Sequence, residues 1–151
     1  MPKIDVTDEA VIDSPPMVVY RAILNEYAGV TSWWMPYLES KLRGDIPIDH
    51  EGGIVDITLH IGRGVTSKMT AKRTKIVEAK SIEEEIAGDS VGTGEWTFEP
   101  TDGKTKVQYR FNCRTNRLLA TLVSPFVNIG KGHSEMMQKG FKALNSYLSK
   151  K

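Results

Sequence analysis

Residues 124–151 read SPFVNIGKGHSEMMQKGFKALNSYLSKK, and this stretch decides the fold. Ser124 is a suitable helix N-cap, and Pro125 fits the first helical position because it has no N–H to satisfy. Seven residues then recur at steps of three or four, which is the spacing that places side chains on one face of a helix. They are Phe126, Gly130, His133, Met137, Phe141, Leu144 and Leu148. We therefore predict an amphipathic helix of about 25 residues, nearly 40 Å long.

A one-faced helix of this length needs a large apolar surface to cover. The inner face of this one is unusual, because it includes Gly130, His133 and Gly140, with Met136 and Met137 nearby. Such residues leave room and flexibility where a plain core helix would use leucine. The helix is therefore either a simple cover for the core or one wall of a pocket.

The length, composition and net charge of the chain are those of an ordinary soluble domain. The 151 residues suit one domain over 1–151, with 40% hydrophobic and 26% charged residues. A formal net charge of +1 gives no bulk electrostatic attraction to nucleic acid or to an anionic membrane. The single cysteine, Cys113, excludes an internal disulfide and a cysteine-rich metal site. No signal peptide or integral membrane segment is visible, so we expect a cytoplasmic protein.

The first quarter of the chain predicts a strand followed by helices. Residues 3–13 alternate polar and apolar side chains, which is typical of a strand. Pro15 and Pro16 suit the start of a helix, and residues 17–25 (MVVYRAILN) form a short amphipathic segment. We predict a second short helix over residues 26–34, with Gly29 near its start. Two adjacent tryptophans, Trp33 and Trp34, cannot both point inward.

Residues 37–115 lose the helical period and alternate with a period of two, which predicts strands. Turn signals separate them, and Asp102-Gly103 marks a tight hairpin. A change of parity at Ile76 predicts a bulge near Arg73–Lys75. The whole pattern predicts an α+β helix-grip fold: a curved antiparallel sheet of about seven strands around a long C-terminal helix, with two short helices after the first strand. Space left between helix and sheet would be a pocket.

This element order resembles the START/Bet v 1-like helix-grip superfamily (SRPBCC) over nearly the whole chain. The segments SPPMVVYRAI (14–23) and SWWMPY (32–37) contribute to the likeness. GEWTFEPTDGKTKVQYRF (94–111) looks like the sixth and seventh strands of the polyketide cyclase/dehydrase-like branch, and GFKALNSYL (140–148) like its final helix. The Hsp90-activator-like branch is matched only in part, by residues 33–36 and Gly52-Gly53, because Met35 stands where that branch usually has glycine. The superfamily hosts binding, transport, cyclisation and co-chaperone roles.

Few residues carry recognisable chemistry. His50 and His60 lack metal-ligand spacing, and we expect neither a metal nor a cofactor. His133 lies on the inner helix face, as either a satisfied buried histidine or a pocket group that handles a proton. We expect Cys113 to be a small core residue. Arg73 and Glu84 fall on inward strand faces, where they could pair with each other, reach solvent or contact a ligand.

The favoured hypothesis is binding of a hydrophobic or aromatic small molecule that is lipid-, polyketide- or isoprenoid-like. A cavity completely filled by side chains would contradict it. An alternative is a polyketide cyclase or dehydratase with His133, Tyr109 and Arg73 as candidate catalytic groups, and another is a protein-binding module of the Hsp90-activator-like kind. Ligand identity and oligomeric state, including a homodimer, stay open. The candidate ligand-binding residues are Trp33, Tyr37, Leu59, Met69, Trp96, Phe98, Tyr109, Phe111, His133, Met137 and Phe141.

Overall fold

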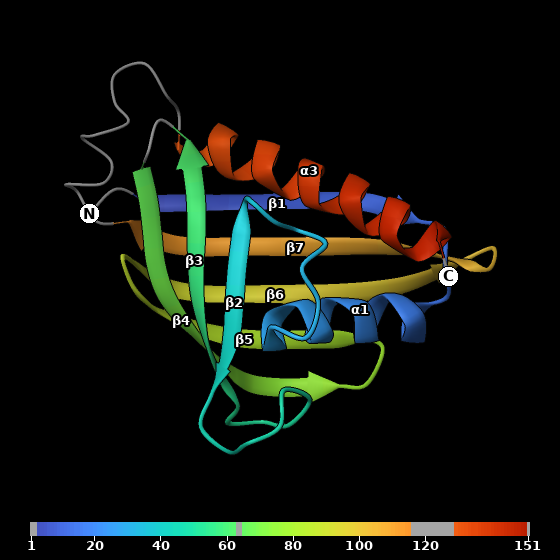
Figure 1. Cartoon of the computed structure of the whole chain (residues 1–151), viewed down its shortest axis with the longest axis horizontal. Coiled ribbons are helices and arrows are strands. Elements are labelled where there is room, and N and C mark those ends of the chain that lie inside the picture. Colours follow the sequence, from blue (N-terminus) through green and yellow to red (C-terminus); the bar gives the residue numbers. More distant parts are fainter. Residues whose placement is uncertain (1–2, 63–64, 116–128, 151) are drawn as a thin grey trace.

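A computed structural model of the protein describes residues 3–62, 65–115 and 129–150. In these ranges a strand and a helix come first, six strands follow, and a long helix comes last (Figure 1). The elements are β1 (Lys3–Ile12), α1 (Pro16–Ala28), β2 (Leu38–Arg43), β3 (Ile54–Gly62), β4 (Val65–Val77), β5 (Ser81–Gly88), β6 (Ser90–Thr101), β7 (Lys104–Thr115) and α3 (Ile129–Ser149).

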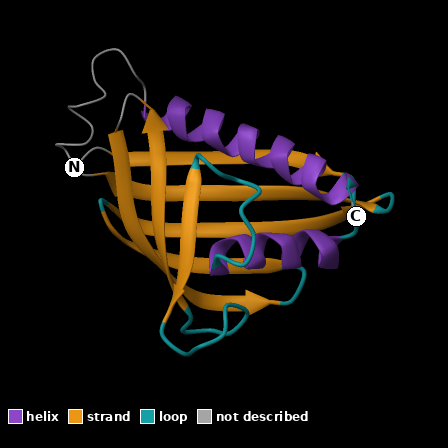
Figure 2. Cartoon of the chain, in the orientation of Figure 1, coloured by secondary structure: helices purple, strands orange, loops and turns teal. Residues whose placement is uncertain are grey.

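The seven strands form one antiparallel sheet in the order β1-β7-β6-β5-β4-β3-β2. The sheet curves so strongly that β2, β3 and the start of β4 run across the direction of β1, β7 and β6 (Figure 1). Both helices lie on the same side of it (Figure 2). The predicted curved sheet around a long final helix is therefore confirmed, and the core lies between that helix and the sheet.

Helix α3 is attached to β1, an edge strand of the sheet. Its Gln138 side chain donates to the carbonyl of Glu9 (3.2 Å), and its Asn145 side chain donates to that of Val11 (3.1 Å). Asn145 also accepts from the backbone N–H of Asp13 (2.8 Å). These amides satisfy backbone groups in and just after β1, on the side of that strand that faces away from β7. The predicted cap at Ser124 and Pro125, and Phe126, lie outside the described residues.

Two local predictions within the sheet are confirmed. The pairing of β4 with β5 shifts register between Arg73 and Lys75, where the bulge was expected. Asp102 and Gly103 join β6 to β7 with φ angles of 51° and 79°. Both angles lie in the left-handed region that a two-residue hairpin turn needs.

The prediction of a second short helix over residues 26–34 is wrong. Helix α1 continues through Glu26 to Ala28 and ends at Gly29, which has φ 81° and donates its N–H back to Asn25 and Glu26. Glycine favours this left-handed helix end because it has no Cβ. After it, the backbone N–H groups of Trp33 and Trp34 bond the Glu26 side chain instead of helix carbonyls. Residues 29–37 therefore form a turn-rich segment between α1 and β2.

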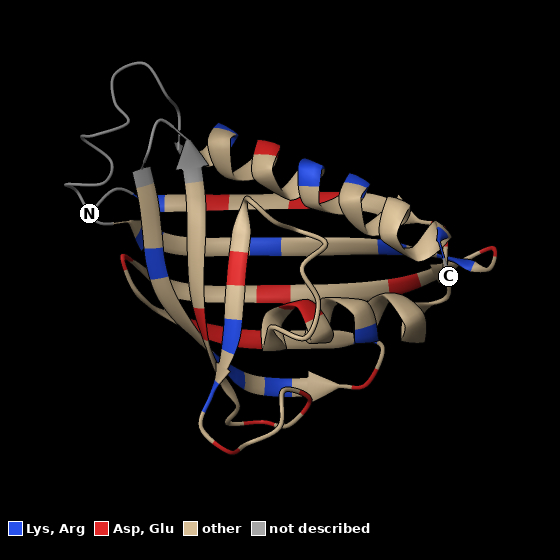
Figure 3. Ribbon diagram, in the orientation of Figure 1, with Lys and Arg blue, Asp and Glu red and all other residues tan. Residues whose placement is uncertain are grey.

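Charged residues of both signs are interspersed along the strands and along α3 (Figure 3). This distribution agrees with the formal net charge of +1. Within the described ranges, no helix combines the length and the apolar character that crossing a membrane requires.

Candidate functional site

The candidate site is a cavity between α3 and the inner face of the sheet, with a volume of about 20 Å³. That volume admits a single water molecule. The wall is mostly apolar and aromatic, with one histidine. It consists of Tyr27, Trp34, Leu38, Ile57, Leu59, Met69, Ile86, Tyr109, Phe111, His133, Met136 and Met137.

Six of the eleven candidate ligand-binding residues lie in this wall: Leu59, Met69, Tyr109, Phe111, His133 and Met137. The other five, Trp33, Tyr37, Trp96, Phe98 and Phe141, lie outside it. Trp96, Phe98 and Phe141 are buried in the surrounding core. The wall residues that sequence reasoning missed are Tyr27, Trp34, Leu38, Ile57, Ile86 and Met136.

Alternation along the strands could have identified some of the missed residues, because Ile57 shares a strand face with Leu59. Nothing in the sequence places Tyr27 against the cavity. Its position depends on where α1 ends, and the predicted boundary at residue 25 was too early.

Of the two adjacent tryptophans, Trp34 faces the cavity and is 2% exposed. Its indole N–H donates to the carbonyl of Met136 on α3 (3.3 Å). Trp33 is only partly buried, and its indole N–H donates to the carbonyl of Ala22 on α1 (3.3 Å). The two rings stack with their centroids 5.4 Å apart. The predicted division of one inward and one peripheral tryptophan is thus confirmed.

His133 and Asp8 form a buried polar pair at the cavity. His133 Nδ1 lies 3.6 Å from Asp8 Oδ2, and each side chain is less than a tenth exposed. The imidazole stacks on Phe111 with a centroid distance of 4.4 Å. Burial disfavours the Asp8 carboxylate, but His133 and Ser134, which approach it from α3, more than offset this and lower the pKa of Asp8.

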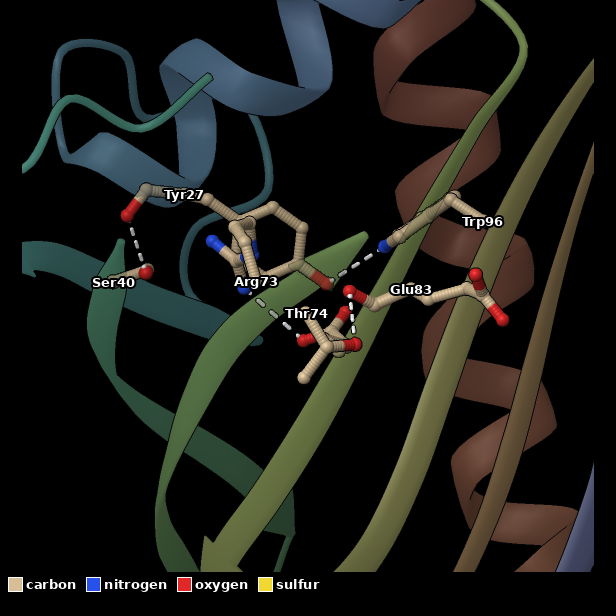
Figure 4. Close-up of polar contacts among 7 residues, drawn as sticks. Tyr27, Ser40, Arg73, Thr74, Glu83 and Trp96 are labelled. Atoms are coloured by element: carbon tan, nitrogen blue, oxygen red, sulfur yellow. Dashed lines mark hydrogen bonds and ion pairs between the residues drawn. The ribbon is translucent and has the colours of Figure 1, made fainter. Parts of the chain in front are cut away.

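Arg73 and Glu84 form the other buried pair, which is one of the alternatives the sequence left open. Arg73 Nη2 donates to Glu84 Oε2 (3.1 Å), and both side chains are 1% exposed. The guanidinium lies over the ring of Tyr27, 5.2 Å from its centroid. The Tyr27 hydroxyl in turn accepts from the indole N–H of Trp96 (3.1 Å; Figure 4). This network borders the cavity through Tyr27.

Several atoms of the two pairs lack a hydrogen-bond partner among the described residues: Asp8 Oδ2, His133 Nδ1, Arg73 Nε and Nη1, and Glu84 Oε1. Burial raises the pKa of Glu84, although the positive charge of Arg73 opposes this. Burial, reinforced by Glu84, also raises the pKa of Tyr109 well above its usual value. The Tyr109 hydroxyl is therefore protonated at neutral pH and can donate a hydrogen bond.

The remaining candidate groups lie away from the cavity or are inert. His50 is exposed and contacts the carboxylate of Asp49 (2.7 Å), and His60 is partly exposed and contacts that of Glu39 (2.8 Å). Cys113 is buried, and burial raises the pKa of its thiol to about 12, so that no thiolate forms at neutral pH. No group of three or more metal-ligating side chains comes together in residues 3–62, 65–115 and 129–150.

Comparison with known proteins gives a family and a fold. The family model described as polyketide cyclase / dehydrase and lipid transport matches residues 3–149. A START superfamily protein from Mycobacterium smegmatis is similar in structure (TM-score 0.72, 12% identity, covering 97% of each chain). So are Ara h 8.0201 (0.68, 18%, 99% of this chain and 100% of that one) and the Zhui aromatase/cyclase from Streptomyces sp. R1128 (0.65, 12%, 97% and 93%). A search of the curated proteins found no match.

Proposed function

Because this chain belongs to the polyketide cyclase/dehydrase and lipid transport family, we propose that it binds a hydrophobic small molecule between α3 and the sheet. The class of ligand is lipid-, polyketide- or isoprenoid-like. The family description suggests binding of a hydrophobic ligand, and so do the START superfamily protein and the aromatase/cyclase that share the fold.

The observation that carries this proposal is the composition of the cavity wall. Aromatic rings and methionines surround a space whose wall also includes His133, and the Nδ1 atom of His133 has no hydrogen-bond partner among the described residues. Buried polar groups are normally hydrogen-bonded, so atoms left without a partner beside a cavity are natural contacts for a ligand. Tyr109 adds a hydroxyl that stays protonated in the same wall.

The cavity must widen to accept such a ligand. Its volume of about 20 Å³ leaves room for one water, so the side chains nearly fill it. Pockets for small organic ligands usually measure about 300–1,000 Å³. Met136 and Met137 contribute flexible side chains that can change rotamer at little cost. The wall therefore forms an adaptable pocket, which in this conformation is closed around a small remaining space.

Native mass spectrometry of the purified protein tests the proposal, followed by denaturing extraction and identification of any bound molecule. A co-purifying apolar molecule at near-unit stoichiometry is the expected result. An empty protein would next be titrated with N-phenyl-1-naphthylamine, a dye whose fluorescence rises in apolar sites. Absence of both a bound molecule and saturable dye binding would contradict the proposal.

The pair of His133 and Asp8 favours a second candidate function, that of a cyclase or dehydratase acting in the same cavity. His133 would remove a proton from a carbon between two carbonyl groups, and Tyr109 would donate to the carbonyl oxygen that gains charge as the new carbon–carbon bond forms. The wall would hold the chain folded for this step. Unchanged turnover of a poly-β-keto thioester mimic by His133→Ala and Tyr109→Phe variants would count against this function.

Arg73, the third candidate catalytic group, is paired with Glu84 and lies outside the cavity wall. A role in turnover for Arg73 stays a prediction, and so does the alternative of a protein-binding module of the Hsp90-activator-like kind. That alternative needs an exposed apolar patch. Val30 and Met35, in the segment between α1 and β2, are 72% and 45% exposed. Pull-down with the intact protein and with a Val30→Ser, Met35→Ser variant tests it.

A further inference from the structure

Residues 29–37, which we call the aromatic strap, link α1 to β2 and are tied to α1 by one buried carboxylate. Glu26 is 3% exposed, and its Oε1 accepts from the Thr31 hydroxyl (2.6 Å) and from the backbone N–H of Trp33 (3.1 Å). Its Oε2 accepts from the backbone N–H of Trp34 (2.7 Å). Three hydrogen bonds to one charged group set the conformation of the strap at the two tryptophans.

The strap also contacts α3, through Trp34. Its indole lies so close to the backbone of Gly140 that a Cβ at position 140 would overlap the indole atoms Cε2, Nε1 and Cζ2. The indole N–H donates to the carbonyl of Met136, one turn earlier on the helix. Glycine at position 140 therefore creates the notch in α3 into which the Trp34 ring fits. From this notch Trp34 contributes to the cavity wall.

The outer residues of the strap reinforce the same contact. Trp33 stacks on Trp34 and also on Tyr147 of α3, at a centroid distance of 6.5 Å. The ammonium group of Lys139 lies 4.8 Å from the centre of the Tyr37 ring. One aromatic stack, one cation–π contact and one hydrogen bond therefore join the strap to α3.

The two long sides of α3 are held differently. On one side, Gln138 and Asn145 bond the edge backbone of β1. On the other side lies the strap, whose turn-rich backbone belongs to no helix or strand. The strap has backbone hydrogen bonds within its own turns, and its Tyr37 carbonyl accepts from the backbone N–H of His60 on β3. A turn segment outside any helix or strand still rearranges more easily than a strand that is paired within the sheet, as β1 is. Opening of the cavity is therefore expected on the strap side.

We propose that the aromatic strap is the gate of the cavity. The Trp34 ring in the Gly140 notch closes the cavity, and we call it the plug. The Glu26 carboxylate holds the strap in this closed conformation, and we call it the latch. This inference rests on the proposed function, because a gate requires a ligand that passes it. Withdrawal of the Trp34 indole adds its volume to the cavity and exposes the carbonyl of Met136. The ligand that takes its place is an apolar molecule, and a planar ring with a hydrogen-bond donor fits the vacated notch best.

The test measures the association rate of N-phenyl-1-naphthylamine by stopped-flow fluorescence. Glu26→Gln keeps the shape of the latch but replaces an accepting oxygen by an amide donor that faces N–H groups. We expect association about tenfold faster, the change that corresponds to losing one hydrogen bond to a charged group. Gly140→Ala, which excludes the plug from its notch, is expected to accelerate binding similarly. Asn145→Ala, on the β1 side of α3, is the matched control and should bind at the wild-type rate.

Trp34→Ala removes the plug, so the dye should associate rapidly with this variant. Adding Glu26→Gln to Trp34→Ala should not increase the association rate further. A further readout uses Trp33→Phe, in which Trp34 is the tryptophan next to the notch and Trp96 stays buried. Dye binding should shift the tryptophan emission to the red and increase quenching by acrylamide. Thermal unfolding followed by circular dichroism identifies any variant that fails to fold, and the remaining variants then carry the test.

The outcomes separate the gate from the binding site. Saturable dye binding at equal rates in wild type, Glu26→Gln, Gly140→Ala and Trp34→Ala would overturn the gate and leave the proposed binding function standing. Faster binding in Asn145→Ala alone would place the opening on the β1 side and overturn the gate as well. Absence of dye binding in every variant, Trp34→Ala included, together with no co-purified molecule, would overturn both proposals.

Discussion

At the scale of single residues, two buried ionisable pairs distinguish this core from a purely apolar one. Arg73 and Glu84 are 1% exposed, and each retains a polar atom without a partner among the described residues. Asp8 and His133 repeat the arrangement beside the cavity. Burying an ion pair costs desolvation energy that its attraction only partly offsets. These residues are therefore sensitive to the loss of either partner.

Glu84→Gln is expected to lower the free energy of unfolding by about 3–5 kcal/mol, because it leaves the Arg73 charge buried and uncompensated. Urea unfolding at neutral pH measures this loss. Asp56→Asn is a control of the same chemistry, since it breaks the exposed ion pair with Arg43 and should change stability little. Equal stability of the two variants would show that the buried pair contributes nothing.

Asp8 should contribute a pH dependence to stability. Its pKa is lower in the folded protein than in the unfolded chain, so the carboxylate stabilises the fold above the unfolded value of about 3.8. This contribution is lost as the pH falls through the lowered folded pKa. Asp8→Asn should therefore lose less stability than the wild type between pH 5 and pH 3, as measured by urea unfolding. An unchanged pH profile in this variant would contradict the assignment. Asp13→Asn, at an exposed carboxylate, is the control.

At the scale of elements, the end of α1 determines how the strap begins. Gly29 ends the helix with φ 81°, and a Cβ there would lie 2.8 Å from the carbonyl oxygen of Ser40 on β2. The chain must turn at this point to bring Trp34 against α3. Local sequence signals could not decide between a helix end and a helix start at Gly29, because glycine is compatible with both.

Gly29→Ala is expected to destabilise the protein by more than the ~1–2 kcal/mol that the left-handed conformation alone costs a non-glycine residue. The additional loss comes from the overlap with Ser40. Gly103→Ala isolates the conformational cost, since Gly103 has φ 79° and no neighbouring atom within 4 Å of the added Cβ. Thermal unfolding of both variants makes the comparison. The interpretation fails if Gly103→Ala is the more damaging change.

At the scale of the whole molecule, a curved sheet and one long helix enclose the cavity, and their separation determines its volume. The described conformation brings them close enough to leave about 20 Å³. Helix α3 is bonded to β1 on one side and contacts the strap on the other. The molecule therefore has one side that can open while the sheet and its register stay unchanged.

Ligand binding should stabilise the whole fold, because a ligand that binds only the folded state shifts the unfolding equilibrium. At a concentration of N-phenyl-1-naphthylamine one hundred times its Kd, the free energy of unfolding should rise by about 2.7 kcal/mol. Thermal unfolding with and without the dye measures this effect. Saturable fluorescence without any shift in the transition would mean that the dye binds unfolded or surface sites.

The sequence alone determined the strands, the first and the final helix, and their order, but it also predicted a second short helix over residues 26–34 that the structure lacks. Alternation with a period of two predicted the strands, the helical period predicted α3, and the parity change at Ile76 predicted the bulge between Arg73 and Lys75. Periodicity carries this information because one face of each element must be buried. It also placed Tyr109, Phe111, His133 and Met137 on inner faces, and the structure finds all four in the cavity wall.

Only the tertiary structure decided which inner residues meet the cavity and how large it is. Trp96, Phe98 and Phe141 have the same inward pattern as the wall residues, but they are buried in the core outside the cavity wall. The choice of Trp34 over Trp33, the notch at Gly140 and the pair of Asp8 with His133 each join residues more than 100 positions apart. Local patterns record which face is buried. They do not indicate which distant side chain packs against that face, because this depends on how the elements pack together.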